Sequence, residues 1–246
     1  MIASLPMYDR PELHDAFDRL WTAVRTELGE GPECLARGGD VWADWQSADL
    51  LLSQTCSLPY RAKLHDNVSL VGTPDHGLEH ANSGFYCSVF IARRDDNRQS
   101  PEDFADARLA YNEVLSQSGW AAPSAYADKH GFSLDHVVHC GSHRASAKAV
   151  AEHRADFAAL DAVSWYMIQR YDDFASKLDK IGQTEPTPAL PFITAPSGNP
   201  ERILDALRKA IASLSESDRD KLCLQSVVKI PKQAYLDMPI PSAPLA

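Results

Sequence analysis

One stretch of the chain, residues 108–142, restricts the possible fold more than any other. It holds two short apolar segments, residues 109–111 and 136–140, with a helical pattern between them. Strands separated by a helix in this way form right-handed βαβ units with parallel strands. We therefore expect two parallel strands in this stretch, and an α/β fold.

Small and polar residues follow each of these two expected strands. The first leads into residues 116–119, Ser-Gln-Ser-Gly, and the second into residues 141–143, Gly-Ser-His, and a helical pattern follows each turn. Both helix starts would then lie at the carboxyl edge of one sheet. Helix starts carry free N–H groups and partial positive charge, which favour an anion. This edge is therefore predicted to form half of a ligand site.

The rest of the chain continues the alternation of strands and helices. Compact apolar runs that end in polar residues are typical of parallel strands buried on both faces. We expect strands at residues 2–7, 49–54, 68–71, 85–91, 109–111, 137–140, 157–160 and 190–194. We expect helices at residues 10–28, 40–45, 119–129, 144–153, 163–171, 200–214 and 215–224. The tail after residue 230 is rich in proline and is expected to be peripheral.

The order of these elements indicates two Rossmann-like α/β lobes, the second inserted into the first. This holds if the strand at residues 85–91 and the return near residues 181–187 both cross between the lobes. Lobe 1 would comprise residues 1–91 and 184–246, and lobe 2 residues 92–183. The length of 246 residues is enough for two lobes with cores of their own.

Charge and hydropathy exclude some classes of partner. The net charge of −10 argues against a nucleic-acid partner, because no basic stripe would neutralise phosphates. No window approaches 18 consecutive apolar residues, so no membrane insertion is expected. The N-terminus has no basic region followed by an apolar core, so no secretory signal is expected. The sequence as it stands predicts a cytoplasmic protein, or a periplasmic one if a leader has been removed.

The cysteines and histidines give no strong motif. The five cysteines are dispersed and odd in number, which argues against a disulfide framework. Of the nine histidines, His76 follows Asp75 and His80 follows Glu79, and three more lie at residues 136, 139 and 143. Without paired cysteines or an H-E-x-x-H helix, we expect no metal site, and we expect no cofactor.

A catalytic alternative rests on two residues. Cys56 follows an expected strand, and with His143 as base it would form a nucleophile pair, for which Cys140 is a rival. Nothing marks a third, orienting group, and the chain contains no G-x-S-x-G, P-loop or G-x-G-x-x-G motif. We expect a protein that is not an enzyme, with a catalytic relative of thiamine-precursor type as the alternative.

Five segments in order carry a resemblance to a known family. They are residues 1–9, 49–60 (D-L-L-L-S-Q-T-C-S-L-P-Y), 85–93, 109–119 (L-A-Y-N-E-V-L-S-Q-S-G) and 141–161. Over about residues 1–195 the chain resembles the phosphate/phosphite/phosphonate-type substrate-binding proteins of ABC transporters, which have the class II periplasmic binding-protein fold. The resemblance implies a two-lobed clamp that closes on an oxyanion ligand about two crossover strands.

The resemblance also implies which residues contact the ligand. The residues that would hold the oxyanion are Ser116, Gln117, Ser118 and His143. Those that would face it from the first lobe are Tyr8, Gln54, Thr55 and Tyr60. Those that would lie at the rim or hinge are Tyr86 and Asp161. Gln117 departs from the family pattern, in which a hydroxyl residue is common at this position.

Each of these positions also has a purely structural interpretation. The Ser116 turn could simply cap a helix, which stabilises it by about 1 kcal/mol. His143 could be a capping or surface histidine, and Asp161 could be the N-cap of the helix that follows it. The partners implied are a small oxyanion and an ABC permease, with a sensor role as the alternative to transport. We expect a monomer.

Overall fold

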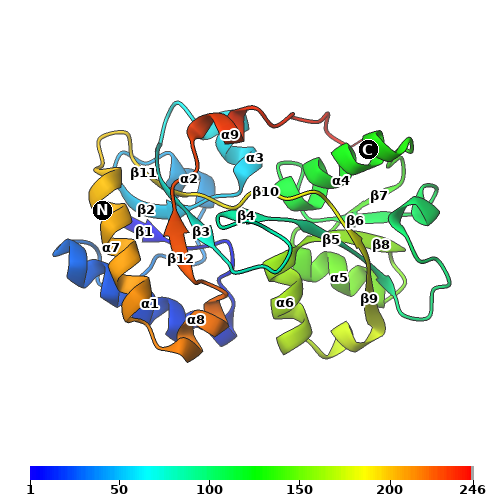
Figure 1. Ribbon diagram of the computed structural model, residues 1–246, viewed down its shortest axis with the longest axis horizontal. Coiled ribbons are helices and arrows are strands. Elements are labelled where there is room, and N and C mark those ends of the chain that lie inside the picture. Colours follow the sequence, from blue (N-terminus) through cyan, green and yellow to red (C-terminus); the bar gives the residue numbers. More distant parts are fainter. Residues whose placement is uncertain (245–246) are drawn as a thin grey trace. The chain divides into compact units, whose positions relative to one another are not determined.

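The computed structural model describes residues 1–244, and the chain divides into two compact units (Figure 1). Unit 1 comprises Met1–Phe85 and Pro188–Met238, and unit 2 comprises Tyr86–Thr187 and the segment that begins at Pro239. The last two residues of the predicted lobe 1 lie outside the described part of the chain. The lobe boundaries drawn from the sequence, and their motion as a clamp, stay predictions.

Unit 1 is built on a five-stranded sheet in the order β1-β2-β11-β3-β12. The strands are β1 (Ile2–Ser4), β2 (Leu50–Gln54), β11 (Phe192–Thr194), β3 (Ser69–Asp75) and β12 (Ser226–Val228). β1 and β2 are parallel, whereas β11 runs antiparallel to β2 and β3, and β12 runs antiparallel to β3. The predicted return of residues 190–194 into the first unit is confirmed. β1, β2 and β3 therefore end at the same edge of the sheet.

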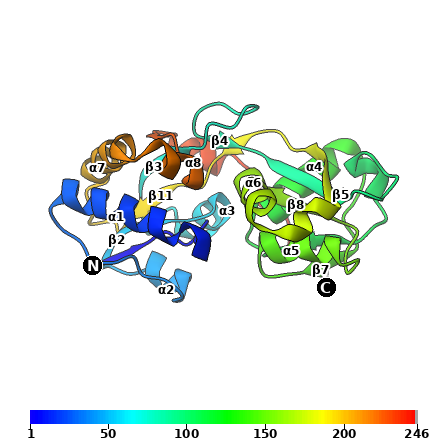
Figure 2. The same ribbon diagram turned by 90° about the horizontal axis from the view of Figure 1, so that it is seen from below.

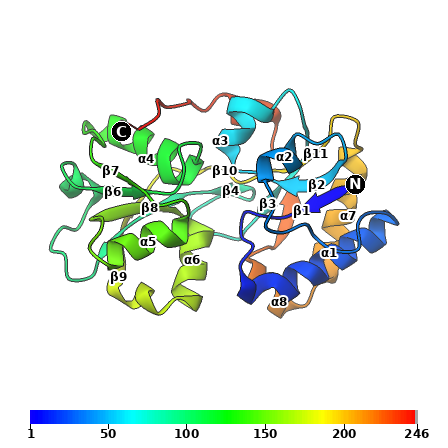
Figure 3. The same ribbon diagram turned by 180° about the vertical axis from the view of Figure 1, so that it is seen from behind.

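Helices cover both faces of this sheet. They are α1 (His14–Leu28), α2 (Val41–Trp45), α3 (Ser57–Pro59), α7 (Pro200–Ser213), α8 (Glu216–Leu222) and α9 (Lys232–Leu236). Figure 2 shows α1 and α7 side by side, and Figure 3 shows α1 and α2 on opposite sides of β1 and β2. α3 continues directly into a π-helical turn, Tyr60–Leu64. Gly29 ends α1 in the left-handed conformation, with φ of 67°, where glycine has no Cβ to clash.

The prediction that the tail after residue 230 is peripheral is wrong for α9, which packs into unit 1. Tyr235 is fully buried in unit 1, and its hydroxyl donates to the carbonyl of Ala189 at 3.0 Å. The Thr73 hydroxyl lies 2.6 Å from the same oxygen. Because the tyrosine proton is used on Ala189, Thr73 is the donor of this second bond. β12 was also missed, because it joins the sheet through pairing with β3, a segment far away in the sequence.

Unit 2 has a second five-stranded sheet in the order β7-β6-β8-β5-β9. Its strands are β7 (Val137–His139), β6 (Leu109–Tyr111), β8 (Phe157–Asp161), β5 (Ser88–Arg93) and β9 (Leu178–Gln183). β6 runs parallel to β7 and β8, as the sequence predicts, but β5 runs antiparallel to β8 and β9. The sheet is therefore mixed. Two short strands, β4 (Phe85–Tyr86) and β10 (Thr187–Pro188), pair where the chain passes between the units.

The three central strands of the unit 2 sheet, β6, β8 and β5, are buried along almost their whole length. Along β5, Val89 and Ile91 pack into one cluster, with residues of α5 (His143–Ala151) and α6 (Ala162–Tyr171). Phe90 and Ala92 alternate with them and pack on the other face. Figure 1 shows α4 (Ala122–His130) on this second face and α5 and α6 on the first. This sandwich fixes the carboxyl ends of β6 and β7.

We predict that Tyr235→Phe lowers the free energy of unfolding by about 1–2 kcal/mol, because the buried Ala189 carbonyl loses its donor. Urea denaturation measures the change. Tyr166→Phe is the matched control: Tyr166 is 41% exposed, so its effect should stay within about 0.5 kcal/mol. Equal effects of the two substitutions would show that α9 is peripheral after all.

Candidate functional site

The parallel pairing of β6 with β7 brings two turns of unit 2 together. Tyr111, the last residue of β6, lies opposite His139, the last residue of β7. Beyond the strands the pairing continues, because Cys140 N–H donates to the Tyr111 carbonyl at 2.8 Å and Gly141 N–H donates to the Asn112 carbonyl at 3.0 Å. The two turns therefore begin hydrogen-bonded to each other.

The turn after β6 opens a π-helical segment, Gln117–Ala121. Ser116 is its N-cap, and the Ser116 hydroxyl oxygen accepts a hydrogen bond from Gly119 N–H at 3.0 Å. Ser116 therefore caps the helix, as the purely structural interpretation of this turn predicts. The first N–H groups of a helical segment have no acceptor within it. Ser116, Gln117 and Ser118 are all at least 96% buried, so their polar groups face protein or a ligand rather than bulk water.

Gly119 and Asn112 fit closely against each other in this turn. A Cβ atom on Gly119 would lie 1.9 Å from Asn112 Oδ1, so no other residue fits without a rearrangement. Asn112 Oδ1 is itself buried and has no hydrogen-bond partner among the described residues. Asn112 thus touches both turns, the first through its side chain and the second through its carbonyl. No sequence pattern marks Asn112, because its close approach to Gly119 depends on tertiary packing.

The turn after β7 leads into α5. Gly141 adopts φ of +80°, and Ser142 caps α5 by accepting from Ala145 N–H at 3.1 Å. His143 is the first residue of the helix, and its Nε2 lies 2.9 Å from the Ser118 hydroxyl oxygen. The predicted meeting of the turns that begin at Ser116 and Gly141 is therefore confirmed within unit 2.

His143 is a neutral side chain in this setting. Its Nδ1 is buried and has no hydrogen-bond partner in the described part of the chain. Burial lowers the pKa of the imidazole to about 4. The partial positive charge of the helix start further disfavours the imidazolium form. At neutral pH this part of the site therefore consists of uncharged hydrogen-bonding groups and helix dipoles.

The other two predicted residues of unit 2 are also deeply buried. Asp161 ends β8, and its Oδ1 accepts from Val163 N–H at 2.8 Å and Ser164 N–H at 3.0 Å. It is thus the N-cap of α6, as its structural interpretation says. Tyr86 lies in β4 and is 1% exposed. A direct contact of either side chain with a ligand stays a prediction.

Three of the predicted residues of unit 1 lie at or beyond the carboxyl ends of its parallel strands. The Tyr8 ring follows β1 and packs edge-on against His76, with 5.5 Å between the ring centroids. Gln54 ends β2, and its Nε2 donates to the Leu190 carbonyl at 3.1 Å. Thr55 N–H donates to the Pro191 carbonyl. His76, which follows β3 at the same edge, was not singled out as a ligand residue from the sequence.

Tyr60 lies in the hydrophobic core of unit 1. It is 1% exposed and packs edge-on against Tyr235 at 5.4 Å between centroids. Burial raises the pKa of its phenol to about 12. A direct contact of Tyr60 with a ligand stays a prediction. The turn pattern of residues 55–60 does not reveal which of its side chains points inward.

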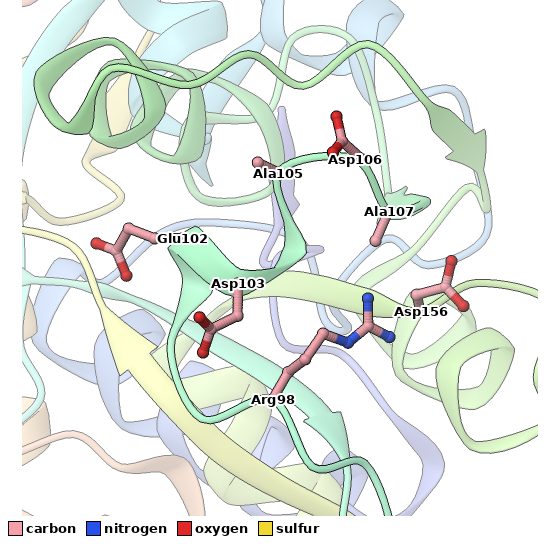
Figure 4. Close-up of a pocket in the computed structure, with 7 residues that line it drawn as sticks. All are labelled: Arg98, Glu102, Asp103, Ala105, Asp106, Ala107 and Asp156. Atoms are coloured by element: carbon pink, nitrogen blue, oxygen red, sulfur yellow. The ribbon is translucent and has the colours of Figure 1, made fainter.

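A cavity of about 300 Å³ lies at the opposite end of the parallel strands of unit 2 (Figure 4). It is lined by Arg98, Glu102, Asp103, Ala105, Asp106, Ala107 and Asp156. Ala107 and Asp156 precede β6 and β8, whereas Ser116 and His143 follow β6 and β7. Arg98 donates to both carboxylate oxygens of Asp96, which offsets its charge. Asp156 is likewise paired with Arg108, which leaves three carboxylates in the lining, Glu102, Asp103 and Asp106, so the cavity does not suit an oxyanion.

Two further findings concern the described residues as a whole. Within residues 1–244, no group of three or more His, Cys, Asp or Glu side chains is placed to hold a metal ion. None of the helices in this range is both long enough and apolar enough to span a bilayer.

Comparison with known families identifies the class of protein. The model of the family described as "ABC transporter, phosphonate, periplasmic substrate-binding protein" matches residues 45–232. This match spans most of the chain, and the chain belongs to that family. The family consists of solute-binding proteins and not of enzymes, so the catalytic alternative with Cys56 and His143 is set aside. No curated protein matches the sequence.

Solved structures share the fold over almost the whole chain. PhnD1 from Prochlorococcus marinus (MIT 9301), in complex with methylphosphonate, has a TM-score of 0.72 at 17% identity over 95% of this chain and 94% of its own. A binding-protein component of an ABC phosphonate transporter from Pseudomonas aeruginosa has a TM-score of 0.72 at 14% identity, over 95% and 83%. A histidine kinase sensor domain with similarity to periplasmic binding proteins has a TM-score of 0.59 at 16% identity, over 94% and 98%. These likenesses establish the periplasmic binding-protein fold.

The low pKa of His143 predicts a pH dependence of stability. As pH falls below about 6.5, the unfolded chain takes up a proton at this side chain, whereas the folded chain does so only near pH 4. Stability that is present above pH 6.5 is therefore lost as pH falls. Between pH 6.5 and 4, the wild type should lose about 2–3 kcal/mol more of its free energy of unfolding than His143→Gln. Equal losses in urea denaturation would show that His143 is not kept neutral by burial.

Proposed function

We propose that the protein binds a small phosphonate or related oxyanion through the two helix starts of unit 2, and that Ser116, Gln117, Ser118 and His143 form this part of its site. The observation that carries the proposal is the hydrogen bond between Ser118 and His143. It joins two turns, each of which ends in a helix start with free N–H groups.

The donors available suit an oxyanion. The Ser116 oxygen already accepts from Gly119 N–H, so its own hydrogen is free to donate to a ligand. The free amides at the starts of the two helices add further donors and partial positive charge. Hydrogen bonds to a charged group contribute about 1.5–3 kcal/mol each. Several of them together support micromolar binding, which corresponds to about 8 kcal/mol.

Our proposal assigns the remaining contacts to the carboxyl edge of unit 1. Ligands of open α/β sheets bind beyond the carboxyl ends of the strands, and Tyr8, Gln54 and Thr55 follow or end such strands. Closure of the two units about β4 and β10 is part of the proposal. The proposal leaves out Tyr60, whose ring packs against Tyr235 in a hydrophobic cluster.

Membership of the family supports delivery of the ligand to an ABC permease in the periplasm. That the protein acts as a monomer is part of the proposal. A sensor role is the second candidate, because a histidine kinase sensor domain shares the fold. Isothermal titration calorimetry with methylphosphonate, phosphite, phosphate and methanesulfonate tests the binding step. We expect saturable binding of one ligand per chain at micromolar or lower concentration for at least one phosphorus oxyanion. Absence of saturable binding for all four would contradict the proposal.

Removal of the two serine hydroxyls tests the proposed residues. Replacing Ser116 and Ser118 together by Ala should weaken binding of the preferred oxyanion by about 2–4 kcal/mol, because two donors to the anion are lost. Calorimetry measures the change, and thermal melting checks the fold. Ser133→Ala is the matched control, since the hydroxyl of Ser133, on the surface of unit 2, donates to neighbouring Asp135. Unchanged affinity in the double variant would remove both serines from the site.

A further inference from the structure

We propose that His143 is a positioning residue that acts through Ser118: it donates from Nε2 to the Ser118 oxygen and so turns the Ser118 hydrogen toward the ligand. This inference rests on the proposed function and goes beyond it. The resemblance implies only that a histidine at this position contacts the ligand.

The first step concerns the hydrogen bond itself. His143 Nε2 and the Ser118 oxygen are 2.9 Å apart, and either atom can supply the proton. A serine hydroxyl has one hydrogen and two lone pairs, and a neutral imidazole has one N–H. If Ser118 donates to the ring, its hydrogen is used and cannot reach an anion. If the ring donates to Ser118, that hydrogen is free.

The second step concerns the other ring nitrogen. Nδ1 of His143 is buried and has no hydrogen-bond partner in the described part of the chain. With the proton on Nε2, Nδ1 is a buried acceptor without a donor. With the proton on Nδ1, it is a buried N–H without an acceptor, which is the rarer situation in folded proteins. Because burial keeps the ring neutral, only one of its two nitrogens carries a proton. This comparison places that proton on Nε2.

The third step concerns the donors that remain for the ligand. Nε2 is engaged by Ser118, and Nδ1 is buried. The two serines then have the same arrangement. Ser116 accepts from Gly119 N–H and Ser118 accepts from His143, and each keeps its own hydrogen for the oxyanion. This side of the site offers donors only, which matches fully deprotonated oxygens of the ligand.

A double-mutant cycle tests the inference with methylphosphonate as the probe. His143→Gln keeps an amide donor near the position of Nε2, whereas His143→Asn reaches only as far as Nδ1. We expect His143→Asn to weaken binding about tenfold and His143→Gln to weaken it less than about threefold. In a Ser118→Ala background, both should change affinity less than about twofold, because the group through which they act is gone.

Other outcomes of the cycle would overturn the inference. A tenfold loss from His143→Asn in both backgrounds would mean a contact independent of Ser118. Equal effects of the Asn and Gln variants would mean that the Nε2 donor has no role. If the wild type itself does not bind methylphosphonate or any other oxyanion, it is the proposed function that fails.

A spectroscopic measurement covers the case in which a variant does not fold. Nitrogen-15 chemical shifts of the His143 ring in the ligand-free wild type report which nitrogen carries the proton. We expect a protonated Nε2 and a bare Nδ1 at pH 7, independent of any ligand. A protonated Nδ1 would show that Ser118 donates to the ring, which would overturn the inference.

Discussion

The parallel pairing of β6 with β7 is the interaction on which the proposed site depends. Because the two strands are in register to their last residues, Tyr111 and His139, the turns that follow start side by side. Two backbone hydrogen bonds extend the pairing into the turns, and the bond between Ser118 and His143 closes it at the far end. The proposed site is therefore a continuation of the sheet.

The positive potential at the two turns comes from helix dipoles and not from charged side chains. None of the residues that meet there, Ser116 to Gly119 and His143, carries a charge at neutral pH. The neighbouring Arg144 has its guanidinium bound to Asp172, with Nε 2.7 Å from Oδ1. In the proposed site, helix dipoles would therefore favour an anion within an acidic protein of net charge −10. The acidic cavity near Arg98 lies at the other end of the strands, away from this environment.

Local sequence patterns predicted the strands and helix caps that are determined by residues close to them in the chain. β6 and β7 are short apolar runs, and the N-caps Ser116, Ser142 and Asp161 lie where polar residues precede helical patterns. The parts that were missed depend on distant segments. α9 is fixed by the contact of Tyr235 with Ala189, 46 residues away, and Asn112 acquires its role only through contact with Gly119. The burial of Tyr60 against Tyr235 is of the same kind, and so are the antiparallel directions of β5, β11 and β12.

The central claim is that an oxyanion binds at the two helix starts of unit 2. Nuclear magnetic resonance of the backbone amides during titration with the preferred oxyanion measures this directly. The account predicts saturable shifts of the amide signals of Ser118, His143 and Arg144, with little change at exposed helix starts elsewhere, such as Glu216 of α8. Saturable binding that leaves these three amides unchanged would contradict the account, whatever the affinity.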